Sequence, residues 1–466
     1  MNPHLATVVY VIGIAGLFVL DRDPRARTSR ALWIPVFWLL INGSRPVSLW
    51  FHTGPLVVTS DQYLEGSPLD AAVYGILLVA GLAVLASRSN RVAVLLRTNL
   101  PILLFLSYCA ISVFWSNYPF VAFKRWNKAV GDFVMVLIVV TDRDPLSAMK
   151  RLFTRVAFVL VPFSVLLIKY YPDLGRSYTP WTWQPMYSGV TTFKNLLGMT
   201  CLVCGLGSLW CFLTAYREPK TPQRRGHLIA HGALLVMVLW LFWITNSKTS
   251  STCFLMATGV MILLSERWFR RRPVLVHGIV ATLVGLSLCA LFLDSAGFLV
   301  HSLGRDSTLT GRTEIWKAVL SVAQNPLLGS GFESFWLGKR LQAVEQLTLQ
   351  NLQEAHNGYL EVYLNLGWMG VGLLALLIVT GYRSVLAVLR RDQQMGMIRM
   401  AFVVVGLTYS LTEAGFRMMC LVWIAFLLAI VEVPRSRPRK KATEPLPRST
   451  EVSPAPAALP AQEEYV

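Results

Sequence analysis

The chain has 466 residues, of which 54% are hydrophobic and only 15% are charged, and its mean hydropathy is +0.52. These values exclude an ordinary soluble enzyme and indicate a membrane protein. The net charge of +18 is also typical of nucleic-acid-binding proteins. The basic residues, however, stand in short loops beside apolar runs, where they act as an orientation signal, so no nucleic-acid partner is expected.

Apolar stretches near the bilayer-spanning length recur along the chain and predict an all-α polytopic fold with about 12–13 transmembrane helices. The first stretch lacks a basic n-region and a cleavage site, so we expect a retained span rather than a signal peptide. Basic clusters between the spans predict a cytoplasmic carboxyl terminus and an external amino terminus. The expected spans are near 4–20, 31–50, 70–87, 99–115, 129–141, 153–170, 195–214, 228–245, 252–265, 274–297, 366–389, 400–413 and 418–433.

The chain is expected to divide into four parts. They are 1–297 with transmembrane helices 1–10, a large periplasmic loop at 298–366, 367–433 with helices 11–13, and a disordered basic, proline-rich cytoplasmic tail at 434–466. Long loops on a helical scaffold often carry function, so the loop is the first place to look for a site.

Two stretches of the loop, Arg312 to Asn325 and Phe332 to Leu349, have apolar residues at helical spacing and predict amphipathic helices. No part of the chain has the pattern of a β-strand. Metal-ligand spacings on the outer face, Walker motifs and dinucleotide fingerprints are all missing from the sequence, so we expect no cofactor, no metal and no use of ATP.

Several cations fall on the expected outer face, against the orientation rule. Each alone is explained by snorkelling to the headgroups, but together they indicate a receptor for an anion such as a phosphate. These cations are Lys124, Arg125, Lys128, Arg176, Lys194, Lys248, Arg312 and Arg417. Arg45 is an intramembrane charge, which indicates either a functional residue or a partner for Asp61 or Glu65. Glu413 and Arg417 stand four apart and are expected to form an ion pair.

His356 lies at the end of the expected loop, just before a span, and Asn357 is the expected N-cap of the helix that follows. His356 is either a solvated loop residue or a group placed for proton chemistry. The pattern of His356, Asn357, Gly367 and Gly370 resembles that of the O-antigen ligase and polymerase superfamily of bacterial inner membranes. Residues 311–316 (GRTEIW) and 325–332 (NPLLGSGF) look like the other half of the same family domain.

Two further segments, 115–119 (WSNYP) and 193–198 (FKNLLG), are similar to the exopolysaccharide polymerase branch of the superfamily. The resemblance implies transfer of a glycan from undecaprenyl pyrophosphate to a sugar hydroxyl at the periplasmic face, with inversion and without a metal. The implied partners are this lipid-linked donor, the sugar-hydroxyl acceptor, the lipid bilayer and a chain-length-regulating membrane protein.

On this resemblance His356 is the catalytic histidine and Arg312 an essential arginine near the donor pyrophosphate. Lys248 stands where many relatives have arginine. The further candidates for substrate binding are Lys194, Arg176, Asn357 and Arg45.

The expected chemistry is consistent with these residue types. An imidazole near its ordinary pKa suits proton abstraction at neutral pH, and cations are needed to stabilise a departing pyrophosphate. The choice between polymerase and O-antigen ligase activity remains open, since the two enzymes share a donor and differ in their acceptor. A lipid-linked sugar transporter or flippase is a rival of another class, although the chain shows no internal repeat, and a membrane scaffold or sensor is a third.

Overall fold

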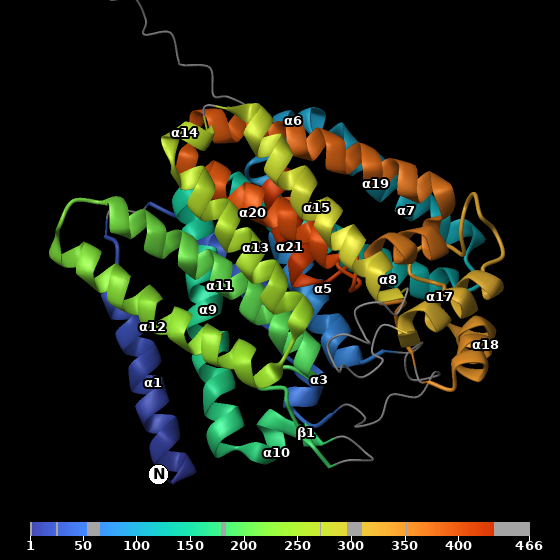
Figure 1. Cartoon of the computed structure of the whole chain (residues 1–466), viewed down its shortest axis with the longest axis horizontal. Helices are drawn as coiled ribbons and strands as arrows, with labels where there is room; N and C mark the ends of the chain where they lie inside the picture. Colours follow the sequence, from blue (N-terminus) through green and yellow to red (C-terminus); the bar gives the residue numbers. More distant parts are fainter. Residues whose placement is uncertain are drawn as a thin grey trace, which may run out of the picture. The chain divides into compact units, whose positions relative to one another are not determined.

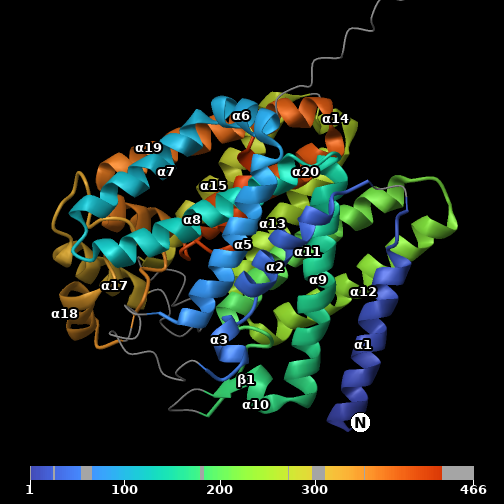
Figure 2. The same ribbon diagram turned by 180° about the vertical axis from the view of Figure 1, so that it is seen from behind.

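The computed structural model describes residues 2–24, 27–53, 66–178, 183–270, 272–295, 310–350 and 352–432. The expected tail at 434–466 and the start of the expected loop at 298–309 lie outside the described residues. Figures 1 and 2 show a helical bundle in which α20 and α21 lie at the centre. The helical fold class predicted from the sequence is confirmed.

Every expected span overlaps a helix, although the span expected at 31–50 is interrupted at residues 43–46. Seven of the described helices are long and apolar enough to cross a membrane, or eight if the bent pair of α6 and α7 is one span. The total of 12–13 spans stays a prediction. The helices are α1 (Pro3–Leu20), η1 (Arg30–Leu32), α2 (Trp33–Asn42), α3 (Val47–Trp50), α5 (Pro68–Ala86), α6 (Ser89–Thr98), α7 (Leu100–Ile111), η2 (Ser112–Trp115), α8 (Pro119–Val140), α9 (Pro145–Tyr170), α10 (Pro172–Gly175), α11 (Lys194–Arg217), α12 (Pro222–Thr245), α13 (Lys248–Ser265), α14 (Arg267–Arg270), α15 (Pro273–Ser295), α17 (Thr310–Val322), α18 (Gly338–Thr348), α19 (Gly358–Arg391), α20 (Gln393–Tyr409) and α21 (Leu421–Ile430).

The expectation that the chain contains no strand is wrong at one place. Strands β1 (Arg176–Tyr178) and β2 (Pro185–Tyr187) pair antiparallel, with Arg176 opposite Tyr187. Strands of three residues are too short to show an alternating pattern in the sequence, which explains why this hairpin was not predicted.

The interior of the bundle is apolar and tightly packed. Helices α9, α11, α20 and α21 are mostly buried, and α11 packs against α9, α12 and α13. By contrast α1 and α5 expose large apolar side chains, among them Ile12 and Ile76 at 66% and 69%. Apolar residues on the outside of a bundle are what a lipid-facing surface requires.

Helix α19 is broken at Gly367, whose φ of +63° is non-helical. The break places the helix against the 325–332 segment, where Trp368 N–H donates to the Pro326 carbonyl at 2.8 Å and Gly331 N–H to the Asn365 carbonyl at 2.9 Å. A Cβ at Gly367 would lie 2.3 Å from the Leu327 backbone, so only glycine fits. Two of the segments that carried the family resemblance therefore form one backbone interface.

The structure also moves two expected boundaries. Helix α19 begins at Gly358 rather than near 366, because Asn357 caps it by accepting hydrogen bonds from the N–H groups of Tyr359 and Leu360. The two amphipathic helices exist as α17 and α18, but α18 begins only at Gly338. The chain before it turns repeatedly through left-handed backbone conformations, at Gly329, Gly331, Glu333 and Gly338.

Candidate active site

His356 lies in the short segment between α18 and α19 and has a left-handed backbone, with φ of +50°. This conformation is unfavourable for a residue with a Cβ and persists where neighbours hold it. On one side Trp316 Nε1 donates to the Ala355 carbonyl at 2.8 Å, and Ala355 N–H donates to Glu361 at 2.5 Å. On the other side Asn357 caps α19. Contacts on both sides thus hold the backbone of His356 in this conformation.

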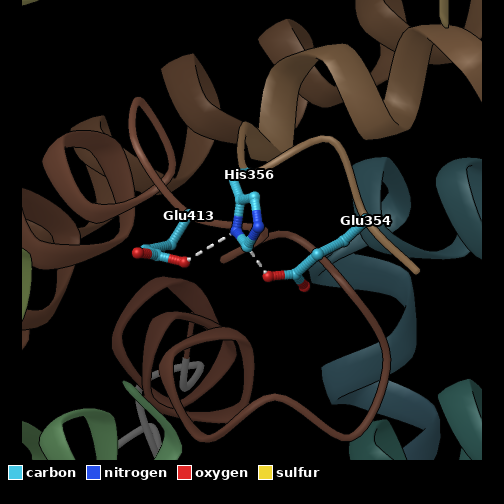
Figure 3. A group of neighbouring side chains, drawn as sticks. All are labelled: Glu354, His356 and Glu413. Carbon is cyan, nitrogen blue, oxygen red and sulfur yellow. Dashed lines mark hydrogen bonds and ion pairs between the residues drawn. The ribbon is translucent and has the colours of Figure 1, made fainter. Parts of the chain in front are cut away.

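Two carboxylates contact one nitrogen of the His356 ring (Figure 3). His356 Nδ1 lies 2.9 Å from Glu354 Oε1 and 3.3 Å from Glu413 Oε2. Carboxylates only accept hydrogen bonds, so Nδ1 carries the proton. The second ring nitrogen, Nε2, makes no hydrogen bond to the part of the chain that the structure describes.

Two arginines complete the cluster. Arg312 Nη2 lies 3.3 Å from Glu413 Oε1. Arg417 contacts two carboxylates: its Nε lies 3.0 Å from Glu333 Oε2, and its Nη1 lies 3.8 Å from Glu354 Oε2. Three carboxylates therefore face two guanidinium groups and the imidazole. We call these six residues, Arg312, Glu333, Glu354, His356, Glu413 and Arg417, the His356 cluster.

The expected pair of Glu413 and Arg417 is replaced by longer-range pairs. Glu413 contacts Arg312 and His356, while Arg417 contacts Glu333 and Glu354. The i, i+4 geometry that motivated the expectation requires a helix, but α20 ends at Tyr409 and α21 begins at Leu421, so both residues lie in the loop between.

Electrostatics hold His356 in its charged form. Burial alone would lower the pKa of His356, but its hydrogen bonds to Glu354 and Glu413, with their negative charge, raise it to about 10. Burial would in turn raise the pKa of Glu354, but His356, Arg417 and Arg312 hold it below its usual value. At neutral pH the resting cluster is therefore an imidazolium between carboxylates, and the expectation of an ordinary histidine pKa is wrong.

The loop that carries Glu413 and Arg417, residues 410–420, is anchored at both ends. Near the start of the loop, the side-chain amide of Asn357 donates to the Leu411 carbonyl at 3.1 Å. Near its end Met419 N–H donates to Asp132 at 2.7 Å, and the same carboxylate accepts from Trp38 Nε1 at 2.8 Å. Asn357 is thus a positioning residue that links α19 to this loop.

Glu354, His356 and Glu413 also place three possible metal-ligand atoms within 4.8 Å of one another. The sequence showed no such cluster because Glu413 comes from a distant loop. The carboxylates already face Arg312, Arg417 and the imidazolium, so ion pairing satisfies them, and a cation would have to compete with a proton at His356.

Lys248 and Lys194 begin two helices that pack together, α13 and α11. Thr249, next to Lys248, contacts Thr412 through a hydrogen bond of 3.2 Å between their hydroxyl oxygens. Since Thr412 precedes Glu413, Lys248 starts its helix beside the His356 cluster. Both lysine side chains are exposed and available to an anion.

Arg45 and Arg176 have structural partners. Arg45 donates to the carbonyls of Gly189 at 3.2 Å and Thr191 at 3.0 Å and also to Leu174, while Arg176 Nε donates to Ile168 at 2.9 Å. They hold the hairpin and the loop before α11. No hydrogen bond or ion pair within the described residues joins either arginine to the His356 cluster. The expected partners Asp61 and Glu65 lie outside the described residues.

Sequence reasoning missed two members of the cluster, Glu354 and Glu333. Glu354 carried a usable signal, since a carboxylate two residues before a candidate histidine can control its protonation. Glu333 carried none, because its relation to Arg417 depends on how the 325–332 segment packs against α19. Arg125, one of the outer cations, is buried and donates to the Glu333 carbonyl.

Comparison with known proteins gives two matches. Residues 232–377 match the family model described as O-antigen ligase, and this range contains Lys248, Arg312, Glu354 and His356. An exopolysaccharide production protein of Rhizobium meliloti (strain 1021), ExoQ, is 23% identical over 288 residues. The match covers 60% of this chain and 63% of that relative, which is less than two thirds of its length.

Fold and site together define a polytopic α-helical membrane protein whose charged cluster joins a loop to the start of a broken helix. The match of residues 232–377 to the O-antigen ligase family and the similarity to ExoQ agree with the resemblance to the O-antigen ligase and polymerase superfamily that the sequence predicted.

Proposed function

We propose that the protein transfers a glycan from a lipid-linked pyrophosphate to a sugar hydroxyl. In the form we favour, it polymerises undecaprenyl-pyrophosphate-linked repeat units into exopolysaccharide or O-antigen at the periplasmic face of the bacterial inner membrane. One observation carries this proposal. Arg312 and His356, which the resemblance assigns to the donor pyrophosphate and to catalysis, contact the two oxygens of a single carboxylate, Glu413, each at 3.3 Å.

Arg312 and Lys248 supply the positive charge for the donor. A pyrophosphate that binds Arg312 competes with Glu413 for its guanidinium group. The planar guanidinium suits two phosphate oxygens side by side. Lys248 adds a point charge from the neighbouring helix, and the Arg312 side chain is 20% exposed, so a ligand can reach it. The polyprenyl chain stays in lipid against the apolar outer helices.

His356 takes the acceptor proton at Nε2. Its resting proton must first leave to solvent, after which the neutral ring, held through Nδ1–H by Glu354 and Glu413, accepts the proton of the sugar hydroxyl. The hydroxyl oxygen bonds to the anomeric carbon as the bond from that carbon to the phosphate oxygen breaks on the opposite face. The pyrophosphate leaves with the electron pair, and the product is inverted.

O-antigen ligase activity is the second candidate, and the description of the matching family favours it specifically. It uses the same donor and the same residues but transfers finished polymer to a lipid A-core or another acceptor. Transport of lipid-linked sugar is a rival that gives no role to a proton acceptor.

Analysis of glycans from a strain that lacks the gene separates these functions. If the lost protein is a polymerase, the strain accumulates single repeat units on lipid. If it is a ligase, the strain accumulates full-length polymer that is not attached to an acceptor. If it is a flippase, lipid-linked units remain on the cytoplasmic side of the membrane, and this result would contradict glycan transfer. Complementation with His356→Ala at normal expression should restore no polymer, and full restoration would overturn the proposal.

A further inference from the structure

A cavity of about 190 Å³ lies between the chain after η2, the 323–330 segment, α18 and the start of α19. Two segments singled out in the sequence, WSNYP and NPLLGSGF, line it side by side. The chemistry of the His356 cluster uses neither of them. The polar and aromatic residues that line the cavity are Trp115, Asn117, Gln324, Asn325, Arg340 and Tyr363.

Most polar groups of this cavity have unused hydrogen-bonding capacity. Within the described residues the side chains of Asn117, Gln324 and Tyr363 make no hydrogen bond. Asn325 uses only its oxygen, which accepts from two backbone N–H groups at 3.1 and 3.0 Å, so its amide N–H groups remain. Amides and a phenol that both donate and accept match sugar hydroxyls, and the indole of Trp115 offers an apolar face.

Arg340 adds a charge that its surroundings do not balance. Arg340 is only 9% exposed, and among the described residues its Nε has no hydrogen-bond partner. Nη2 makes one long contact of 3.5 Å with the Ser334 carbonyl. No carboxylate pairs with Arg340 in the described ranges of the chain, and burial lowers its pKa. A buried guanidinium in this state favours a ligand that brings a carboxylate.

The cavity is close to the His356 cluster along a rigid element. Tyr363 is on the first part of α19, which starts directly after His356 and Asn357. At the helical rise of about 1.5 Å per residue, Tyr363 lies roughly 8 Å along the axis from Gly358, the first residue of the helix. A short oligosaccharide can bridge that distance, with one sugar in the cavity and a hydroxyl of the next at His356.

We propose that this cavity is the acceptor subsite and that it holds a sugar carrying a carboxylate, a uronic acid. The inference rests on the proposed glycan transfer and specifies its acceptor class. Arg340 binds the carboxylate, the amides of Asn117, Gln324 and Asn325 bind ring hydroxyls, and Trp115 covers the apolar face of the ring.

Saturation-transfer NMR and calorimetry on the full chain in detergent test this, with two matched probes. Cellobiouronic acid carries a carboxylate where cellobiose carries a hydroxymethyl group. We expect the acidic disaccharide to bind at least tenfold more tightly. Arg340→Gln should remove this preference, Arg340→Lys should keep part of it, and Asn117→Ala should weaken both probes.

Lys339→Gln is the control, because it removes one positive charge next to Arg340 from an exposed position that does not line the cavity. Its binding should equal that of the wild type, and thermal unfolding checks that each variant is folded. Equal loss in Lys339→Gln and Arg340→Gln would overturn the inference, as would equal binding of the two probes or none. His356→Ala should lose glycan transfer but keep the preference for the acid over cellobiose, so failure of the transfer chemistry is distinguishable from failure of the subsite.

Discussion

At the scale of single residues, Glu413 decides how the candidate site is charged. It lies between Arg312 and His356, so a pyrophosphate that takes Arg312 changes the field at the imidazole. Because the pKa of His356 is raised from 6.5 to about 10, the ion pair stabilises the fold fully below about pH 6.5. That stability is lost as the pH rises through about 10.

The same shift predicts the pH dependence of catalysis. If neutral His356 accepts the proton, the transfer rate rises with pH toward a midpoint near 10. Glu413→Gln removes a charge that raises this pKa, so the midpoint should move to lower pH in rate profiles of the reconstituted protein. Glu314→Gln, at an exposed position on α17, is the control and should leave it in place. A rate that falls as the pH rises would mean that the imidazolium is the active form.

Chelation tests the three possible metal-ligand atoms of the cluster. We expect the transfer rate to be unchanged after dialysis against EDTA, because Arg312, Arg417 and the imidazolium already neutralise the carboxylates. A loss of activity that added divalent cation restores would instead assign Glu354, His356 and Glu413 to a metal.

At the scale of elements, the sequence predicted helices better than their ends. The spans were visible because apolar runs of bilayer length have one common cause, and Asn357 was recognisable as a cap. The start of α18, the β1–β2 hairpin and the break in α19 depend on tertiary contacts that local patterns do not record. His356 and Arg312 were predicted from local motifs. Their carboxylate partners were not assigned, because those pairs are also tertiary contacts.

The break in α19 gives a prediction with an internal control. Gly367→Ala places a Cβ against the Leu327 backbone at a left-handed φ, which costs about 1–3 kcal/mol for the conformation alone. We expect a lower melting temperature and loss of activity. Gly372→Ala, on the same helix with no atom within 4 Å of the added carbon, should have little effect. Equal melting temperatures for the two variants would show that the interface with 325–332 is not important.

At the scale of the whole bundle, α8 separates two charged regions. Near its start Arg125 donates to Glu333 of the His356 cluster, and near its end Arg88 donates to the Ile138 carbonyl at 3.0 Å. From Arg125 to Ile138 this helix advances about 20 Å at 1.5 Å per residue. In the orientation proposed above, the basic clusters and the candidate site are expected on opposite faces of the membrane.

Cysteine labelling measures this sidedness. In a Cys289→Ser background, which removes an exposed native cysteine, Leu349→Cys at 90% exposure should react with an impermeant maleimide added to intact spheroplasts. Lys220→Cys, in the exposed basic segment after α11, should react only after permeabilisation. The reverse pattern would invert the proposed orientation.

The most direct test of glycan transfer at the His356 cluster is polymer formation by the purified protein. Wild-type protein in proteoliposomes, supplied with the lipid-linked repeat units of its host, should release undecaprenyl pyrophosphate and give products longer by whole repeat units in mass spectra. His356→Ala with an unchanged melting temperature should give none. Elongation by this variant at the wild-type rate would contradict the account.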